Sequence, residues 1–325
     1  MLFEDLSLSK SIQKAVYEEG YTHPTPIQEQ SIPLVLAGRD LIGCAQTGTG
    51  KTAAFAIPII HQLHRIVGSS KKAKEIRALI VTPTRELAVQ IGQNIDTYAK
   101  YTNLTQITLF GGVSQVPQVD TLKKGVDVVI ATPGRLLDLH KQGFINLDHL
   151  HTLVLDEADQ MLDMGFINDV KKIVKLTPKN RQTLLFSATM PIAIRELAEM
   201  FLKDPAKVEV SPVSSTAEKV EQRIYFVEKT EKRNLLYHLI KNENLSNVLV
   251  FSRTKHGADN VVKALRKNNI AAEAIHGDKS QNARQRVLEA FKNKEVGVLV
   301  ATDIAARGID IDQLPFVINF DLPNI

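Results

Sequence analysis

The amino-acid sequence predicts an α/β fold in which two units follow one another, each with a mainly parallel sheet and helices on both faces. Short runs rich in Val, Ile and Leu alternate with segments of helical pattern, which is typical of parallel sheets covered on both sides. The runs are continuous rather than alternating in polarity, which indicates strands buried on both faces. A Ser- and Pro-containing stretch at residues 211–218 separates the two series of runs, so we expect a linker there.

The first unit, residues 1–210, contains the longer series of expected strands. These strands are Asp40–Ala45, Ala78–Thr82, Ile107–Phe110, Asp127–Ala131, Thr152–Leu155 and Thr183–Ser187. Helical patterns between them include Ala53–Ile66, Arg85–Tyr101 and Asn168–Leu176.

The second unit, residues 219–325, repeats the alternation without repeating the sequence. Its expected strands are Arg223–Val227, Asn247–Ser252, Ala271–His276, Gly297–Thr302 and Phe316–Phe320. The sequence stops directly after the last of these, with no closing helix. We therefore expect the second sheet to be incomplete.

Composition excludes several classes of protein. The 325 residues include 40 Lys+Arg and 36 Asp+Glu, for a formal net charge of +4, so nucleic-acid binding would depend on local geometry rather than on net charge. The single cysteine, Cys44, excludes an internal disulfide framework and a cysteine-built zinc site. No apolar run approaches the roughly 20 residues of a membrane span, and the acidic N-terminus is unlike a signal peptide. We expect a soluble, cytoplasmic protein.

A phosphate-binding loop is the strongest single motif. The segment Ala45–Thr52 follows an expected strand, precedes an expected helix, and fits the pattern G-x-x-x-x-G-K-[ST] except for Ala45 in the first position. Gly48 and Gly50 let backbone N–H groups turn toward a phosphate. Lys51 would neutralise phosphate oxygens, and the hydroxyl group of Thr52 would bind Mg²⁺.

Two adjacent acids end the expected strand at Thr152–Leu155. A carboxylate at the C-terminal end of a strand beside a phosphate loop is where Mg²⁺ is held, so we assign this role to Asp156. Glu157 can then orient or deprotonate the water that attacks the γ-phosphate. The catalytic residues predicted are therefore Glu157, Asp156 and Lys51.

Here the chain resembles a known family. The sequence Asp156-Glu157-Ala158-Asp159 spells the box that names the DEAD-box ATP-dependent RNA helicases, and other family motifs occur in order across nearly the whole chain. The wording of Leu162–Phe166 is most similar to bacterial members. The resemblance implies two RecA-like domains, the cofactors ATP and Mg²⁺, and RNA as the partner. It also implies that ATP and single-stranded RNA draw the two domains together.

The family's adenine-sensing Q motif is similar to Gly20–Gln28. An amide can pair with N6 and N7 of adenine, so Gln28 would select ATP over GTP, and Phe3 and Tyr21 would contact the base. The nucleotide-binding residues implied are Phe3, Tyr21, Thr25, Gln28, Gln46, Thr47, Gly48, Thr49, Gly50, Lys51, Thr52, Gly308 and Asp310. In the family's coupling motif, the hydroxyl groups of Ser187 and Thr189 would hydrogen-bond the carboxylate of Asp159.

The RNA-binding residues implied by the resemblance contact backbone and sugar, which gives little sequence specificity and a preference for RNA through its 2′-OH. In the first unit they are Pro83, Thr84, Arg85, Gly111, Gly112, Thr132, Pro133, Gly134 and Arg135. In the second unit they are Arg253, Gly277, Gln281, Arg284, Thr302 and Asp303.

The chain departs from the family pattern at its end. The family's next motif carries arginines that reach the γ-phosphate, and it should begin shortly beyond Ile325. We therefore expect a truncated helicase, and its own ATPase and unwinding activities are left open. Two other functions also remain open: an ATP-gated RNA clamp that does not unwind, and a DNA translocase of the same superfamily.

Overall fold

A computed structural model describes residues 1–68, 75–210, 220–306, 311 and 314–322 of the chain. The chain forms two compact units, Met1–Glu218 and Lys219–Ile325. The expected linker, residues 211–218, lies outside the described residues.

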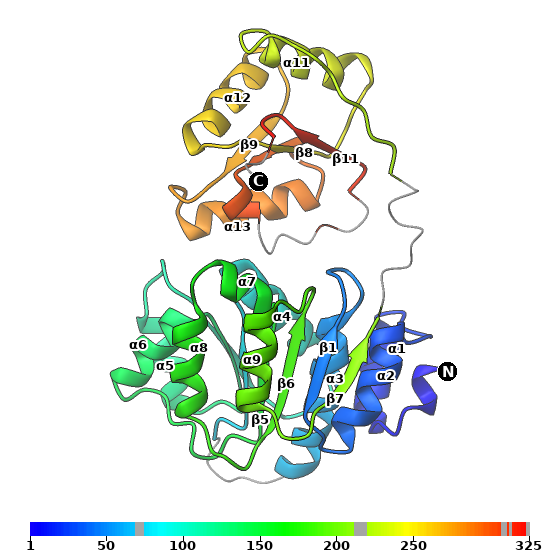
Figure 1. The fold of residues 1–325 in the computed structure, drawn as a ribbon, viewed down its shortest axis with the longest axis vertical. Helices are drawn as coiled ribbons and strands as arrows, with labels where there is room; N and C mark the ends of the chain where they lie inside the picture. The colour runs from blue at the N-terminus through cyan, green and yellow to red at the C-terminus, as the bar shows by residue number, and fades with distance from the viewer. Residues whose placement is uncertain (69–74, 211–219, 307–310, 312–313, 323–325) are drawn as a thin grey trace. The chain divides into compact units, whose positions relative to one another are not determined.

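The first unit is built on a seven-stranded sheet in which every paired strand is parallel to its neighbour, in the order β3-β4-β2-β5-β6-β1-β7. Figure 1 labels β5, β6, β1 and β7 of this sheet. The strands are β1 (Leu41–Cys44), β2 (Ala78–Val81), β3 (Gln106–Leu109), β4 (Val128–Ala131), β5 (Thr152–Leu155), β6 (Gln182–Ser187) and β7 (Ala206–Glu209). The strands predicted from the sequence are confirmed to within a residue or so at each end.

Helices cover both faces of this sheet because alternate strand residues face opposite sides. One core contains Leu41, Ile80 and Phe186 and joins the sheet to α1–α4. The other core contains Ile42 and Leu79, and it joins the sheet to α5–α9. The bounds are η1 (Phe3–Asp5), α1 (Lys10–Glu18), α2 (Pro26–Leu36), α3 (Lys51–Val67), α4 (Arg85–Tyr98), α5 (Val116–Lys124), α6 (Pro133–Lys141), α7 (Ala158–Asp163), α8 (Ile167–Lys175) and α9 (Ile192–Phe201).

The strand order sorts the predicted motifs along one edge of the sheet. Since all the strands run in the same direction, their carboxyl ends meet at one edge, where ligands bind in open α/β sheets. The phosphate loop follows β1, the acidic pair follows β5 and the coupling motif follows β6, and these three strands are neighbours. The three RNA motifs follow β2, β3 and β4, which form the adjoining part of the sheet.

The second unit contains a four-stranded sheet of parallel pairs in the order β11-β8-β10-β9. Its strands are β8 (Val248–Phe251), β9 (Ala272–Ile275), β10 (Val298–Ala301) and β11 (Phe316–Asn319). The helices α11 (Lys232–Asn242) and α12 (Lys255–Lys267) pack on one face, and α13 (Gln281–Lys292) packs on the other. A short helix, α14 (Asp303–Ala306), follows β10. The predicted fold class, two tandem α/β units with mainly parallel sheets, is confirmed, and the second unit is the smaller of the two.

One strand prediction is wrong. The segment Arg223–Val227 was expected to be a strand, but it pairs with none of the described strands and has no regular secondary structure. Its apolar side chains lie open to solvent, with Ile224 83% and Phe226 97% exposed. An apolar, β-branched run becomes a strand only where it pairs with a sheet edge and covers a face, and this segment does neither among the described residues.

Within the described residues, none of the helices combines the length and the apolar character that crossing a membrane requires.

Candidate functional site

The phosphate loop turns sharply between β1 and α3. Gly48 and Gly50 have φ angles of 78° and 91°, in the left-handed region that residues with a Cβ adopt at a cost. Gly50 is the residue directly before α3, which begins at Lys51. The first N–H groups of a helix have no intrahelical partner and attract anions, so this turn aims backbone donors at one point.

Gln28 ties the Q motif to this loop. Its side chain is only 4% exposed. Its Oε1 accepts a hydrogen bond from the backbone N–H of Thr25 (2.9 Å), and its Nε2 donates to the carbonyl oxygen of Gly50 (3.2 Å). Thr25 Oγ1 donates to the carbonyl oxygen of Thr49 at 2.8 Å. The Q motif therefore holds the conformation of the phosphate loop in addition to any contact with a base.

The two aromatic residues of this region differ in accessibility. Phe3 is 5% exposed and belongs to the core of the first unit. Tyr21 is half-buried, and its ring lies 5.8 Å from that of Phe3 between ring centroids. Its hydroxyl group shares a hydrogen bond with that of Tyr98 (3.2 Å). Tyr21 is thus the better placed of the two to contact a base.

The acidic pair after β5 contacts the lysine of the phosphate loop and is nearly inaccessible. Asp156 is 3% exposed and Glu157 is 2% exposed. Lys51 Nζ forms an ion pair with Glu157 Oε1 at 2.9 Å. Among the described residues, Lys51 Nζ has no hydrogen-bond acceptor besides this carboxylate, and Asp156 Oδ1 has no donor. Buried charges with unused hydrogen-bonding capacity are costly, so the cluster is suited to a charged ligand.

Burial, together with the charge of Glu157, raises the pKa of Asp156 to about 7. A divalent cation beside this carboxylate would favour its ionised form. The donor set therefore fits a nucleotide phosphate at Lys51 and a magnesium ion at Asp156 and Thr52.

The coupling motif meets the acidic box through Asp159. Asp159 Oδ2 accepts hydrogen bonds from both the backbone N–H and the hydroxyl group of Thr189, each at 2.9 Å. The Ser187 hydroxyl group also interacts with the Asp159 side chain. In addition it accepts from the backbone N–H of Asp159 (3.2 Å) and donates to the carbonyl oxygen of Thr189 (2.7 Å). Burial alone would raise the pKa of Asp159, but the hydrogen bonds from Thr189, Ser187 and the backbone of Gln160 outweigh it, and the pKa is lowered.

The predicted RNA motifs of the first unit contain a helix cap at Thr84 and an arginine, Arg135, whose side chain is fixed by hydrogen bonds. Thr84 Oγ1 accepts from Leu87 N (3.2 Å) and so caps α4. Arg135 donates to Gln118 Oε1 and to the carbonyl oxygen of Val113, both at 3.1 Å. Of the other predicted residues, Pro83, Thr132 and Pro133 are buried, whereas Gly112 and Gly134 are exposed and Arg85 and Gly111 are half-buried.

Gln118 is a residue that the sequence prediction missed. It is 8% exposed, and besides binding Arg135 it donates from Nε2 to the carbonyl oxygen of Phe110 at 3.2 Å. It therefore links the arginine to the glycine turn that begins at Gly111. Gln118 is the third residue of α5. Nothing in the sequence distinguishes it from other residues that face a core, so the sequence does not indicate its contact with Arg135.

The predicted residues of the second unit lie around the carboxyl ends of its strands. Arg253 is exposed, and its backbone N–H donates to Asp321 Oδ2 at 3.1 Å. Asp303 is exposed and Thr302 is half-buried. Gln281 is 1% exposed, which fits support of the turn better than a direct contact with RNA. Gly308 and Asp310 lie outside the described residues.

A buried histidine supports the turn at Gly277. His276 is 3% exposed, and its Nε2 lies 3.2 Å from Asp259 Oδ1, which also pairs with Lys279 Nζ at 3.0 Å. This cluster joins α12 to the segment between β9 and α13. It fixes the backbone on either side of Gly277.

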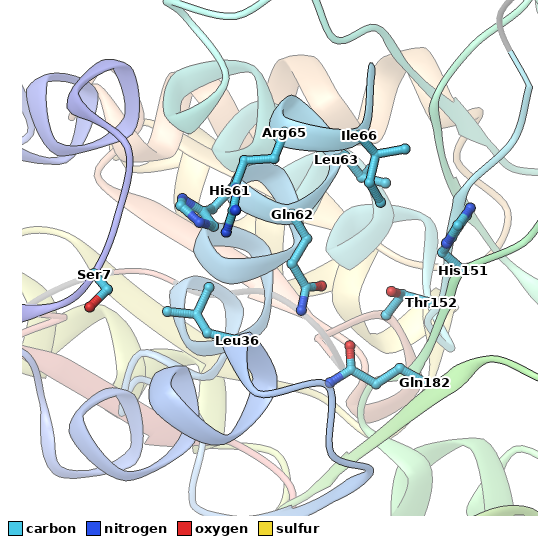
Figure 2. A pocket seen from close by; sticks show the side chains of 10 residues that line it. All are labelled: Ser7, Leu36, His61, Gln62, Leu63, Arg65, Ile66, His151, Thr152 and Gln182. Atoms are coloured by element: carbon cyan, nitrogen blue, oxygen red, sulfur yellow. The ribbon is translucent and has the colours of Figure 1, made fainter. Parts of the chain in front are cut away.

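A pocket of about 670 Å³ lies at the other end of α3, away from the predicted site. The end of α3 and the first residues of β5 and β6 contribute to it (Figure 2). Its two amide side chains, Gln62 and Gln182, donate to the carbonyl oxygen of Val35 at 2.7 and 2.9 Å. The amides already have partners, and no carboxylate is found among the described residues that line the pocket, so it is a poor candidate for catalysis.

Comparison with known proteins agrees with this geometry. Residues 25–197 match the family model of the DEAD/DEAH box helicase, and residues 231–325 match that of the helicase conserved C-terminal domain. The DEAD-box ATP-dependent RNA helicase RhpA of Helicobacter pylori is 44% identical over 321 residues, covering 99% of this chain and 64% of the relative. CshA of Geobacillus kaustophilus is 43% identical, covering 99% of this chain and 68% of the relative. The chain thus spans about two thirds of the length of these relatives.

Solved structures agree as well. The structure of S. cerevisiae Dbp5 bound to RNA and ADP BeF3 has a TM-score of 0.83 and 28% identity, covering 100% of this chain and 81% of that one. A DEAD box protein from Methanococcus jannaschii has a TM-score of 0.60 and 40% identity, covering 99% and 86%. The sequence, the fold and the arrangement of its motifs lead to one conclusion: the chain belongs to the DEAD-box helicase family.

Proposed function

We propose that the chain is an RNA-stimulated ATPase that couples ATP binding and hydrolysis to local separation of RNA duplexes or to remodelling of RNA–protein complexes. The observation that carries this proposal is the buried cluster of Lys51, Asp156 and Glu157 at the phosphate loop, with hydrogen-bonding capacity left unused at Lys51 Nζ and Asp156 Oδ1. The names of the relatives, ATP-dependent RNA helicases, support the choice of RNA.

In this proposal the first unit binds the nucleotide. Gln28 and Tyr21 contact the base, and the backbone of the phosphate loop and Lys51 bind the phosphates. Thr52 and Asp156 would hold Mg²⁺, which supplies neutralisation of the charge on the phosphate oxygens. Glu157 orients the attacking water and accepts its proton. Gly308 and Asp310 of the second unit would bind the ribose.

RNA binds through its backbone and sugars in this proposal, so affinity should depend little on sequence. Arg85 and Arg135 would contact phosphates from the first unit, and Arg253 and Arg284 from the second. Asp159 and Thr189 would couple the nucleotide site to the RNA site, because their hydrogen bonds join the loops after β5 and β6. We propose residues 1–210 and 219–325 as the two functional domains, joined by residues 211–218.

The test is the ATPase rate of the 325-residue chain with single-stranded RNA, with single-stranded DNA of the same sequence as control. Stimulation by RNA alone is the expected result. Lys51→Ala should remove both hydrolysis and nucleotide binding measured by calorimetry. ATP binding without hydrolysis on any RNA would contradict the proposal.

Further outcomes separate the two other functions. ATP-dependent retention of RNA without multiple-turnover unwinding would point to a clamp. Equal stimulation by DNA and RNA would point to a DNA translocase.

A further inference from the structure

The Glu157 carboxylate is held at both of its oxygens. Oε1 pairs with Lys51 Nζ at 2.9 Å. Oε2 accepts a hydrogen bond from Gln160 Nε2 at 3.3 Å. Lys51 is also the residue expected to bind phosphate, so Gln160 is the partner of Glu157 that has no second assignment.

The position of Gln160 in its helix would suggest a simpler role, that of a helix cap, but its contacts do not support this role. Glu157 is the N-cap of α7, and Gln160 is the third residue of that helix. A glutamine at this position commonly folds back to the backbone N–H of the N-cap in a capping box. Here its amide donates instead to the side chain of the N-cap residue.

The backbone of Glu157 is itself constrained. Its φ and ψ angles are both 53°, in the left-handed region that a residue with a side chain rarely adopts. Such a conformation persists where the surrounding contacts impose it, and it directs the side chain along a path that the regular helix would not give. The hydrogen bond from Gln160 then fixes the far end of that side chain.

The other end of the Gln160 amide is unsatisfied. Gln160 Oε1 is buried and makes no hydrogen bond to any described residue. The amide cannot relieve this by turning over, since that would place Oε1 against the Glu157 carboxylate. A buried acceptor left unpaired destabilises the fold, and such groups call for an explanation.

We propose that Gln160 is a positioning residue for ATP hydrolysis, acting by holding Oε2 of Glu157 so that the carboxylate keeps the orientation needed to direct water. This inference rests on the proposed ATPase function. It assigns a role to the residue that directly follows the acidic box.

Two substitutions distinguish this role from support of the helix. Gln160→Met keeps the length of the side chain but removes the donor, and Gln160→Glu places a second carboxylate against Glu157. Glutamate is favourable near a helix N-terminus, so a role in helix support predicts that Gln160→Glu is harmless and Gln160→Met mildly destabilising. The positioning role predicts that both lower kcat and that Gln160→Glu lowers it more.

The experiment measures kcat and KM for ATP at saturating RNA, the affinity for a non-hydrolysable ATP analogue by calorimetry, and thermal unfolding. We expect Gln160→Met to lower kcat about tenfold, the lower end of what supporting residues contribute, with KM and analogue affinity unchanged. Added to Glu157→Gln, it should lower kcat no further, because the two residues act as a unit.

The possible failures are separable. Suppose that the wild-type chain hydrolyses ATP. If Gln160→Met then has an unchanged kcat, or if Gln160→Glu is as active as the wild type, only the role of Gln160 is overturned. A wild-type chain that binds the analogue but never hydrolyses ATP would overturn the proposed function and this inference with it.

Discussion

The phosphate loop should tolerate a methyl group at Gly48 much better than at Gly50. Both residues have left-handed backbones, with φ angles of 78° and 91°, so alanine at either position carries a strain of about 1–2 kcal/mol. The surroundings differ. No described atom lies within 4 Å of a Cβ built at Gly48, whereas a Cβ at Gly50 collides with the amide group of Gln28.

That collision can be relieved only by moving the Gln28 amide. The movement breaks its hydrogen bonds to the carbonyl oxygen of Gly50 (3.2 Å) and from the N–H of Thr25 (2.9 Å). Each bond contributes about 1 kcal/mol, so Gly50→Ala should destabilise the first unit by about 2 kcal/mol more than Gly48→Ala does. The nucleotide should also bind more weakly to Gly50→Ala, because the loop loses its anchor.

The assay is urea unfolding of both variants, followed through the transition of the first unit, with calorimetry of nucleotide binding. The Gln28→Ala background is the decisive control, because it removes both the collision and the hydrogen bonds. In that background Gly50→Ala should lower the free energy of unfolding by no more than Gly48→Ala lowers it in the wild type. Equal costs for the two alanines in the wild type, or an undiminished cost in the Gln28→Ala background, would refute the reasoning.

Three further predictions concern other parts of the chain. Glu157→Gln should bind ATP but hydrolyse it at least about 100-fold more slowly in a single-turnover assay, and wild-type turnover would remove Glu157 from this role. Gln28→Ala should weaken discrimination between ATP and GTP in competition binding. The wild-type Gln28 amide uses one N–H and one lone pair to bind Gly50 and Thr25, so a second N–H and a second lone pair are available for the base. An unaltered preference for ATP would contradict this. Burial would raise the pKa of Asp259, but its hydrogen bonds with Lys279 and His276 outweigh burial and lower this pKa. The ionised Asp259 therefore stabilises the folded second unit at pH values above the pKa of the unfolded state. This contribution disappears as the pH falls through the pKa of the folded state. Asp259→Asn should therefore destabilise the second unit by about 1 kcal/mol at pH 7. The difference should shrink as the pH is lowered through the acidic range, as measured by urea unfolding at a series of pH values.

The sequence was most informative where a function requires a fixed spacing along the chain. The loop Ala45–Thr52 and the pair Asp156-Glu157 could be placed at strand ends because apolar runs precede both. Parallel strands then place all such ends at one edge, so the grouping of the motifs follows from the fold class alone. The capping of α4 by Thr84 is equally local and equally predictable.

Prediction failed where an element depends on partners distant in the sequence. Arg223–Val227 has the composition of a strand, yet a strand also needs an edge to pair with, which no local pattern specifies. Gln118 and Gln160 were missed for the same reason. Each is recognised only through the group that it binds, Arg135 in one case and Glu157 in the other.

The sequence assigns different roles to the two adjacent acids from their order after the strand, and the buried cluster offers a physical reason for that assignment. One lysine lies among two carboxylates, so it can directly neutralise only one of them, and Lys51 Nζ lies against Glu157. Asp156 is left with a free oxygen and a pKa raised to about 7, which is the state that a cation would relieve. Glu157, held by Lys51 at one oxygen and by Gln160 at the other, is instead fixed in orientation. Cation binding therefore suits Asp156 and the direction of water suits Glu157, because the position of one lysine makes the two carboxylates unequal.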